Sequence, residues 1–415
     1  MRIDIPSLRQ RRRDRACRIL VTGAAGFLGS HFAVALLRSG FMVAALVRPG
    51  KRLSAAERIA RLLDWFGLED AFRRNLRVVE GDIGDPALAA GAPALSGALD
   101  GIDEIVHCAS NTAFAERKRP EVEASNIDGL RNVLDLAVRS GCGVFHHVST
   151  AYVAGRKTGL CPEDWVEDGP FTNVYEETKA RGEIMARDVC RREGIRLSVY
   201  RPTIVYGDSR TGRTLRFNAL YFPVKAAVFL RDIYLADIRE RGGRKAAELG
   251  IRLTERGGLV MPIRVEVARE GGINLVPVDH CVRVFMAIME DELEGGIYHI
   301  ANPRPTRIED IVAFAKRHFR LEGVETCGAE DFSGRPKNAL EVLYDSYLEA
   351  YRPYMQDLRT FEIKNAVPAM EKRGLECPEF SYDVFTRCMD YALETNWGAG
   401  LLPNGPLAAG KEGGS

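Results

Sequence analysis

The sequence has 415 residues and an almost balanced charge, with 58 Lys and Arg against 57 Asp and Glu. A net charge of +1 excludes a general electrostatic attraction to nucleic acid or to an anionic membrane surface. With 46% hydrophobic and 28% charged residues, the composition is that of a water-soluble globular protein. The length suffices for two domains, or for one domain with a large insertion.

Nine cysteines are scattered along the chain, and their number is odd. No CxxC or Cys/His spacing occurs, so the pattern indicates neither a disulfide framework nor a zinc site. We therefore expect a reducing, cytoplasmic setting, no metal and no nucleic-acid partner. No apolar run has transmembrane length, while a peripheral membrane contact and a homodimer both stay open.

Both ends of the chain have biased compositions. Residues 9–18 contain six arginines, so we expect residues 1–16 to form a basic, flexible arm. Residues 398–415 are rich in Gly and Pro, and we expect a disordered tail there.

A glycine-rich turn lies between an apolar strand and a helix near the N-terminus. Residues 17–21 are apolar and favour a strand, and Gly23, Gly26 and Gly29 follow at a spacing of three. Apolar residues then recur at helical spacing from Phe27 onward. This arrangement binds a pyrophosphate, because backbone N–H groups and the positive helix end face the anion. For this motif alone, a glycine turn without a ligand is the alternative.

The second expected strand, residues 41–47, ends at Arg48. Sites that bind a free ribose 2′-hydroxyl usually have Asp or Glu here, whereas a guanidinium suits the 2′-phosphate of NADP. Arg48, with Lys51 and Arg52 behind it, therefore favours NADP(H). Asp82 follows the next strand and is a candidate acceptor for the adenine amino group, although an Asp at a turn is also common for local reasons.

Tyr175 and Lys179 lie four residues apart in a segment predicted to be helical, so they share one face. An ammonium group beside a phenol favours the phenolate. We therefore expect Lys179 to lower the pKa of Tyr175 and to make it an acid–base group. A hydroxyl at the end of the expected strand 144–148, from Thr150 or Ser149, could bind the same substrate oxygen.

The order of glycine loop, strand-end hydroxyl and YxxxK resembles the extended branch of the short-chain dehydrogenase/reductase superfamily. The matching segments are residues 22–29, 81–82, 107–110, 126, 149–150, 175–179 and 201–207. The resemblance implies an α/β fold, with a Rossmann-type doubly wound parallel sheet and a smaller, interleaved C-terminal substrate-binding lobe. We expect the NADP-binding domain at residues 17–212, with 273–303 returning to it. The lobe is expected at residues 213–272 and 304–397.

The same resemblance implies roles for the site residues. Tyr175 would donate a proton, Lys179 would tune its pKa and contact the ribose, and Thr150, favoured over Ser149, would hold the substrate oxygen. The implied cofactor contacts are Gly23, Ala25, Gly26, Phe27, Leu28, Gly29, Arg48, Asp82, Ile83, Ala109, Ser110, Asn126, Tyr175, Lys179, Pro202, Thr203 and Ile204.

Within this branch the chain looks closest to the acyl-thioester reductases and fatty acyl-CoA reductases. The likeness lies in residues 46–49, in His107-x-Ala109-Ser110-x-x-x-Phe114, and in residues 275–280 and 298–303. It implies an NADPH-dependent oxidoreductase of lipid metabolism. Its substrate would be an acyl thioester, on CoA or on a carrier protein, reduced to an aldehyde and, by a second reduction, to an alcohol.

The insertion at residues 213–264 is strongly apolar. We expect it to hold the acyl chain, with Phe229 as a contact, although the core of a lid or a dimer interface explains the same composition.

Two other functions stay open. An epimerase, dehydratase or ketoreductase acting on a sugar nucleotide or another hydroxy or keto substrate would need clustered Arg and Lys for a nucleotide diphosphate. A non-catalytic NADP sensor would not need an intact set of Thr150, Tyr175 and Lys179.

Overall fold

A computed structural model describes residues 5–90, 99, 101–267, 270–291, 294–355, 357–399 and 401. Most of the tail predicted at residues 398–415 therefore lies outside the described residues.

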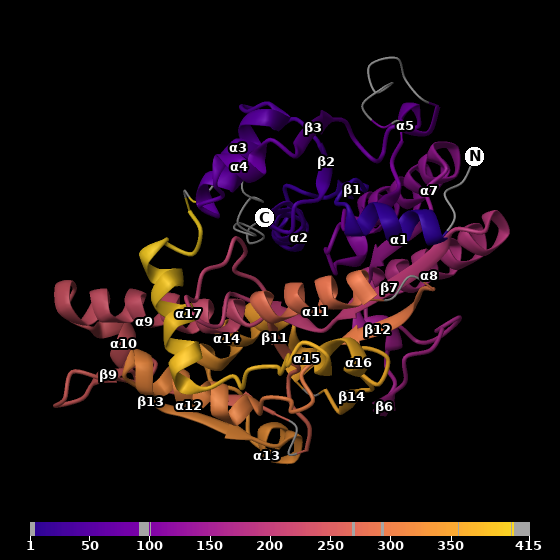
Figure 1. Cartoon of the computed structure of the whole chain (residues 1–415). Helices are drawn as coiled ribbons and strands as arrows, with labels where there is room; N and C mark the ends of the chain where they lie inside the picture. Colours follow the sequence, from indigo (N-terminus) through magenta and orange to yellow (C-terminus); the bar gives the residue numbers. More distant parts are fainter. Residues whose placement is uncertain are drawn as a thin grey trace.

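A parallel sheet of seven strands, in the order β12-β7-β5-β4-β1-β2-β3, forms the centre of the described chain (Figure 1). Its strands are β1 (Arg18–Thr22), β2 (Met42–Val47), β3 (Leu76–Glu80), β4 (Glu104–His107), β5 (Val144–Val148), β7 (Arg196–Pro202) and β12 (Gly296–Ile300). Strand order reverses beside β1, which pairs in parallel with both β2 and β4. In such sheets ligands bind at the carboxyl ends of the strands, at this switch point. The predicted Rossmann-type sheet is confirmed.

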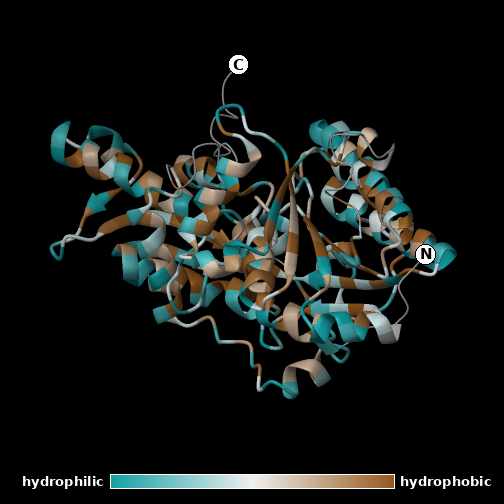
Figure 2. Cartoon of the chain, turned by 45° about the horizontal axis from the view of Figure 1, so that its top comes forward, coloured by the Kyte–Doolittle hydropathy of each residue, from teal (hydrophilic) through white to brown (hydrophobic). Residues whose placement is uncertain are grey.

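Alternate residues of the central strands enter two different cores. Ile19 and Val21 pack with one set of helices, whereas Leu20 and Ile105 pack with the other. Burial on both faces explains why these strands are continuously apolar rather than alternating. Figure 2 shows the largely hydrophobic strands lying among helices of mixed hydropathy.

Helices cover both faces of this sheet. The first face carries α2 (Phe27–Arg38), α3 (Ala55–Trp65) and α11 (Val278–Asp291), and the second carries α7 (Gly129–Ser140) and α8 (Val174–Glu193). Shorter helices in this half are α4 (Asp70–Arg73), α5 (Ala87–Ala90) and α6 (Arg119–Glu123), and one π-helical turn, η2 (Ala124–Asp128), joins α6 to α7.

The N-terminal segment is a packed helix, α1 (Ile5–Arg13). Leu8 is fully buried, and the Arg12 guanidinium pairs with the buried carboxylate of Glu104, which also binds His146 at 2.8 Å. The expectation of a flexible arm is therefore wrong for residues 5–13. The arginine count did not reveal that one of these arginines meets a buried acceptor from β4.

A second, smaller core lies beside the sheet. It joins α9 (Tyr221–Glu240), β10 (Leu259–Glu266), α12 (Ile308–Phe319), β13 (Leu321–Cys327), α14 (Ala339–Leu348) and α17 (Tyr382–Glu394). Side chains of β10 alternate between buried and partly buried, as expected for a strand with one face on a core. Smaller elements here are α10 (Arg244–Glu248), β9 (Arg252–Leu253), α13 (Ala329–Ser333) and α15 (Arg352–Met355).

The chain passes between the two cores more than once. β12 joins the large sheet, whereas β11 (Leu275–Pro277) pairs with β8 (Ile204–Tyr206) and β14 (Arg359–Phe361) pairs with β6 (Gly159–Cys161). Helix α16 (Val367–Glu371) packs on α11, and Ala366 and Ala369 belong to the core of the large sheet. The domain boundaries that the sequence predicts stay predictions. Both alanines lie in the segment predicted for the substrate-binding lobe but pack in the core of the large sheet, so the two lobes interleave again after residue 304.

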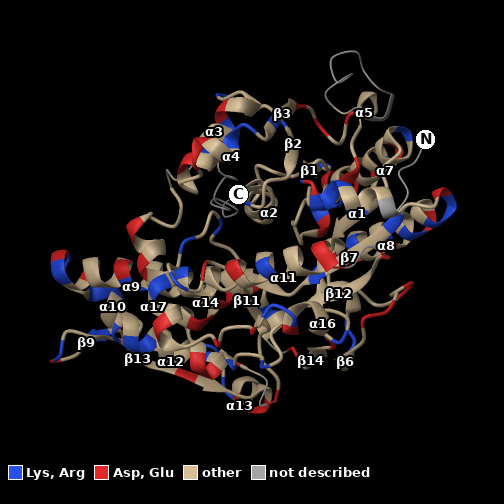
Figure 3. Ribbon diagram, in the orientation of Figure 1, with Lys and Arg blue, Asp and Glu red and all other residues tan. Residues whose placement is uncertain are grey.

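None of the helices in the described ranges is both long and apolar enough to cross a bilayer. Basic and acidic residues are interspersed over both halves of the ribbon in Figure 3, in keeping with the balanced charge.

Candidate active site

The glycine turn joins β1 to α2 by direct backbone packing. Gly26 N–H donates to the Gly23 carbonyl over 2.8 Å. A Cβ on Gly29 would lie 2.2 Å from that carbonyl oxygen, and a Cβ on Gly23, whose φ is +70°, would lie 2.7 Å from Ala109 N. Only glycine fits at these two positions.

The N-terminus of α2 can receive an anion. Gly26 is exposed, and no side chain caps the helix there, so the first N–H groups, from Phe27 and Leu28, have no side-chain acceptor. Ala25 lies partly exposed in the same turn. Backbone donors at a helix N-terminus, with no Cβ in the way, fit the pyrophosphate of a dinucleotide.

Two arginines meet at the end of β2. Arg48 is 70% exposed and lies 3.7 Å from the Asp82 carboxylate. Arg58, from the first turns of α3, donates to the Arg48 carbonyl over 2.5 Å, and burial together with the charge of Arg48 lowers the pKa of Arg58. Two neighbouring guanidinium groups fit a phosphate dianion.

Arg58 was missed by sequence reasoning. It stands ten residues after Arg48, and a capping box at Ser54 starts α3 so that Arg58 turns back toward β2. The capping box, Ser54 with Glu57, was the sequence signal that could have revealed where α3 begins and hence where Arg58 points. Asp82, the expected adenine contact, already accepts the Gly84 N–H at 2.9 Å with one oxygen.

Asn126 ties two parts of the site together instead of presenting a free amide. Its Oδ1 accepts from Asn111 N at 2.8 Å and from Ser110 Oγ at 3.1 Å, and its Nδ2 donates to Thr178 Oγ1 at 3.0 Å. The loop after β4, which carries Ala109, is therefore fixed to helix α8. Nearby, Ile83 packs over Gly129, whose Cβ would lie 2.7 Å from it.

The structure brings Thr150 and Tyr175 together. Tyr175 lies in the first turn of α8, which Asn173 caps by accepting the Glu176 N–H at 3.1 Å. Thr150 follows β5 and caps a short 3-10 helix, η3 (Ala151–Ala154). The side chain of Thr150 hydrogen-bonds Tyr175, whereas the buried Ser149 hydroxyl has no partner among the residues that the structure describes.

Lys179 does not act on Tyr175 in the expected way. Its ammonium donates to the Val148 carbonyl over 2.6 Å, and burial lowers the pKa of Lys179 to about 8. Burial raises the pKa of Tyr175, and the Thr150 hydrogen bond and the charge of Arg216 oppose that rise. The prediction that Lys179 lowers this pKa is corrected, because the carbonyl at the end of β5 holds the ammonium group.

The segment after β7 borders both the loop after β5 and the second lobe. The Pro202 carbonyl accepts from Thr150 Oγ1 at 3.4 Å, and Thr203 Oγ1 donates to Asn274 Oδ1 at 2.8 Å. Ile204, expected beside the cofactor, lines an apolar cavity in the second lobe.

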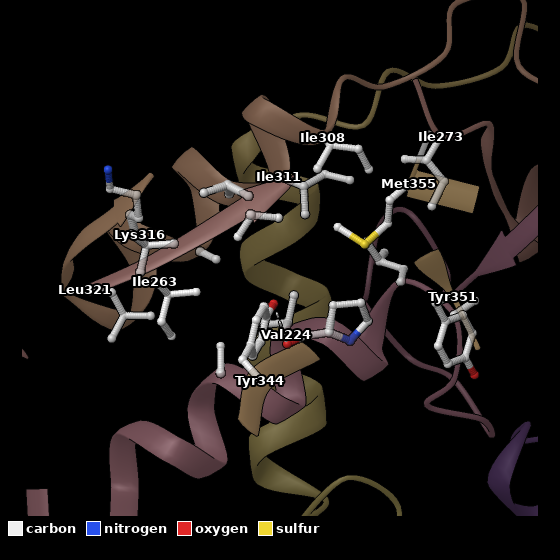
Figure 4. A pocket seen from close by; sticks show the side chains of 18 of the residues that line it. Val224, Ile263, Ile273, Ile308, Ile311, Lys316, Leu321, Tyr344, Tyr351 and Met355 are labelled. Carbon is white, nitrogen blue, oxygen red and sulfur yellow. Dashed lines mark hydrogen bonds between the residues drawn. The ribbon is translucent and has the colours of Figure 1, made fainter. Parts of the chain in front are cut away.

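This apolar cavity has a volume of about 90 Å³. Its walls come from α9, β10, α12, β13, α14 and α15, and they include Leu220, Val224, Ile263, Ile308, Ile311 and Tyr344. Figure 4 shows Tyr351 and Lys316 at opposite ends of the lining side chains.

Phe114 contacts both Tyr175 and two residues of the cavity wall. Its ring centroid lies 6.1 Å from that of Tyr175, 5.9 Å from Tyr351 and 5.6 Å from Tyr354. Both of the latter tyrosines line the cavity. They belong to a segment in which the sequence shows no recognisable motif, so sequence reasoning missed them.

The insertion at residues 213–264 contributes to the cavity, but through the opposite face of helix α9 from the one that carries Phe229. Val224 and Ala227 of α9 line it, whereas Phe229 is 51% exposed and does not. Phe229 is therefore the wrong contact, because helical spacing turns it away from the face that carries Val224 and Ala227. Among the described residues, no group of three or more His, Cys, Asp or Glu could hold a metal ion.

Comparison with known proteins places the chain in a family. The sequence model of the family described as male sterility protein matches residues 21–285. A linear gramicidin synthase of Brevibacillus parabrevis is 23% identical over 394 residues, which cover 91% of this chain and 7% of that protein. Fatty acyl-CoA reductase 1 of Gallus gallus is 30% identical over 225 residues, 45% of this chain and 43% of that reductase. The chain thus spans a small part of the synthase and less than half of the reductase.

The fold also has a solved counterpart. The crystal structure of the terminal R domain from the myxalamid PKS-NRPS biosynthetic pathway matches with a TM-score of 0.71 at 23% identity, covering 92% of this chain and 91% of that one. Together with the match over residues 21–285, the doubly wound sheet shows that the chain belongs to the male sterility protein family, an NAD(P)-binding family of extended short-chain dehydrogenase/reductases.

Proposed function

We propose that this oxidoreductase reduces an acyl thioester with NADPH. One observation carries the proposal: the ring of Phe114 contacts Tyr175 on one side and, on the other, two tyrosines that line an apolar cavity, Tyr351 and Tyr354. An acyl chain would fill such a cavity, since its walls are almost entirely aliphatic and aromatic. A sugar nucleotide would need polar groups in the same place.

The residues of the first half would hold the cofactor. The glycine turn and the N-terminus of α2 would bind the pyrophosphate. Arg48 and Arg58 would bind the 2′-phosphate that distinguishes NADPH from NADH. When bound, NADPH supplies the hydride that adds to the thioester carbonyl carbon.

Thr150 and Tyr175 would act on the carbonyl oxygen. Both hydroxyls lie together at the end of β5 and donate hydrogen bonds where negative charge develops. Because burial raises its pKa, Tyr175 keeps its proton at neutral pH and delivers it to that oxygen. Cleavage of the C–S bond then releases the thiol and leaves an aldehyde. A second hydride and a second proton would give the alcohol.

The test is NADPH consumption with acyl-CoAs and with acyl-loaded carrier proteins, with products identified by mass spectrometry. We expect a free thiol and an aldehyde or alcohol in step with NADPH oxidation, and product formation slower by about 10²-fold or more in Tyr175→Phe. Turnover of sugar nucleotides without any thioester turnover would contradict the proposal.

A further inference from the structure

Tyr354 of α15 reaches from the second lobe to the start of the catalytic helix. Its hydroxyl donates to Glu176 Oε1 at 2.6 Å and accepts from Asn173 Nδ2 at 2.7 Å. Glu176 is fully buried and Tyr354 is 6% exposed. Hydrogen bonds to a buried carboxylate are among the stronger ones in proteins.

The groups that Tyr354 binds fix the first turn of α8. Glu176 Oε2 accepts the Thr172 N–H at 2.8 Å, and Glu176 N–H donates to the capping oxygen of Asn173 at 3.1 Å. Tyr175 lies between Asn173 and Glu176 in sequence. Its position therefore depends on a network that includes a hydroxyl from the other lobe.

Tyr354 lines the cavity, while its hydroxyl binds the helix. Its ring lies 5.6 Å from that of Phe114 and 5.2 Å from that of Tyr152, measured between centroids. Phe114 in turn contacts Tyr175. One side chain thus touches both the space for an acyl chain and the helix that carries the acid.

We propose that Tyr354 is a positioning residue through which an acyl chain in the cavity sets the placement of Tyr175. The inference rests on the proposed thioester reduction and goes beyond it. A chain packed against the ring restricts its motion, and the hydroxyl then holds the start of α8 in one place. The binding energy of the acyl chain, which lies away from the thioester, is in this way used to position Tyr175. Longer chains therefore raise kcat as well as lowering KM.

The test compares two tyrosines of the same cavity. Tyr354→Phe removes the hydroxyl that binds α8. Tyr344→Phe is the matched control, because Tyr344 also lines the cavity but its hydroxyl donates to the Pro223 carbonyl, at 3.4 Å, in α9. Both variants and the unmodified protein are assayed for kcat and KM with acyl-CoAs from short to long, after melting curves have shown that each is folded.

We expect kcat of the unmodified protein and of Tyr344→Phe to rise with chain length. In Tyr354→Phe, kcat should stay flat near the short-chain value, about tenfold below the unmodified protein for long chains, while KM still falls with length. In a second readout without turnover, a long acyl-CoA should slow amide exchange at residues 174–178 in the unmodified protein and not in Tyr354→Phe.

Equal losses at all chain lengths in Tyr354→Phe, or the same flattening in Tyr344→Phe, would overturn the inference. A flat kcat in the unmodified protein would also overturn it, while leaving the proposed function intact. Absence of turnover with every thioester would instead refute the proposed function itself.

Discussion

The proposed cofactor end and the proposed substrate end of this molecule are built in different ways. At the first, backbone groups of consecutive residues 23–29 form the cradle, and the glycines leave room for it. At the second, side chains from residues 204, 219–227, 261–273, 308–324 and 344–355 meet around one cavity. A site made of backbone needs a particular local sequence, whereas many combinations of apolar side chains make an apolar wall.

The two ends meet at Tyr175, and replacing it should have the largest effect. In Tyr175→Phe the hydroxyl that delivers the proton is lost, and general acid catalysis of this kind contributes about 10²-fold or more to kcat. NADPH titration by fluorescence should show unchanged affinity, because the phenyl ring still packs on Phe114. Turnover near that of the unmodified protein would show that another group is the acid.

The backbone cradle can be broken by one methyl group. Gly29→Ala would place a Cβ 2.2 Å from the Gly23 carbonyl, so the turn must open. We expect NADPH binding to weaken at least about tenfold, measured by isothermal titration calorimetry. Gly169→Ala is the control, because nothing lies within 4 Å of its Cβ. Unchanged affinity in Gly29→Ala would mean that this turn does not bind the cofactor.

Sequence alone was sufficient for the sheet and for the order of the motifs, because both follow from local apolar periodicity and glycine spacing. The family resemblance also indicated Thr150 as the partner of Tyr175 at the substrate oxygen, and the two side chains lie together. Sequence reasoning failed for Lys179, whose ammonium binds a carbonyl that no side-chain pattern encodes. It failed for Tyr354 as well, whose contact with Glu176 spans 178 residues of sequence.

The phosphate contact at the end of β2 should set the choice of cofactor. A charge-assisted contact to phosphate contributes about 1.5–3 kcal/mol, so Arg48→Asp should shift the preference for NADPH over NADH by about tenfold or more. Arg74→Asp, at an exposed arginine that precedes β3 and so lies at the other end of that strand from Asp82, should leave the ratio of kcat/KM values unchanged. Equal kinetics with both cofactors in the unmodified protein would contradict the assignment.

The substrate end should respond to cavity size. Each buried methylene contributes about 0.8 kcal/mol, so kcat/KM should rise by roughly fourfold per carbon until the cavity is full. Ala227→Leu should move the optimum to shorter chains, whereas Phe229→Asp, on the exposed side of the same helix, should not. Chain-length profiles with acyl-CoAs provide the measurement. A shift caused by Phe229→Asp would mean that the chain lies on the surface of α9.

The smallest effect expected is a dependence on pH in which activity and the stability of the fold change in opposite directions. Burial lowers the pKa of Lys179 to about 8, below the value near 10.5 of an exposed lysine. The charged ammonium that fixes α8 to β5 is therefore lost as pH rises through about 8, and kcat should fall there.

The contribution of Lys179 to the stability of the fold changes with pH in the opposite direction. Between pH 8 and 10.5 the unfolded chain binds the proton that the folded chain has released, so this group makes the folded state relatively more stable as pH rises. Lys179→Met should remove both trends, and rate profiles and melting temperatures over that range would test them together. An alkaline decline in kcat that persists in Lys179→Met would assign the titration to another group.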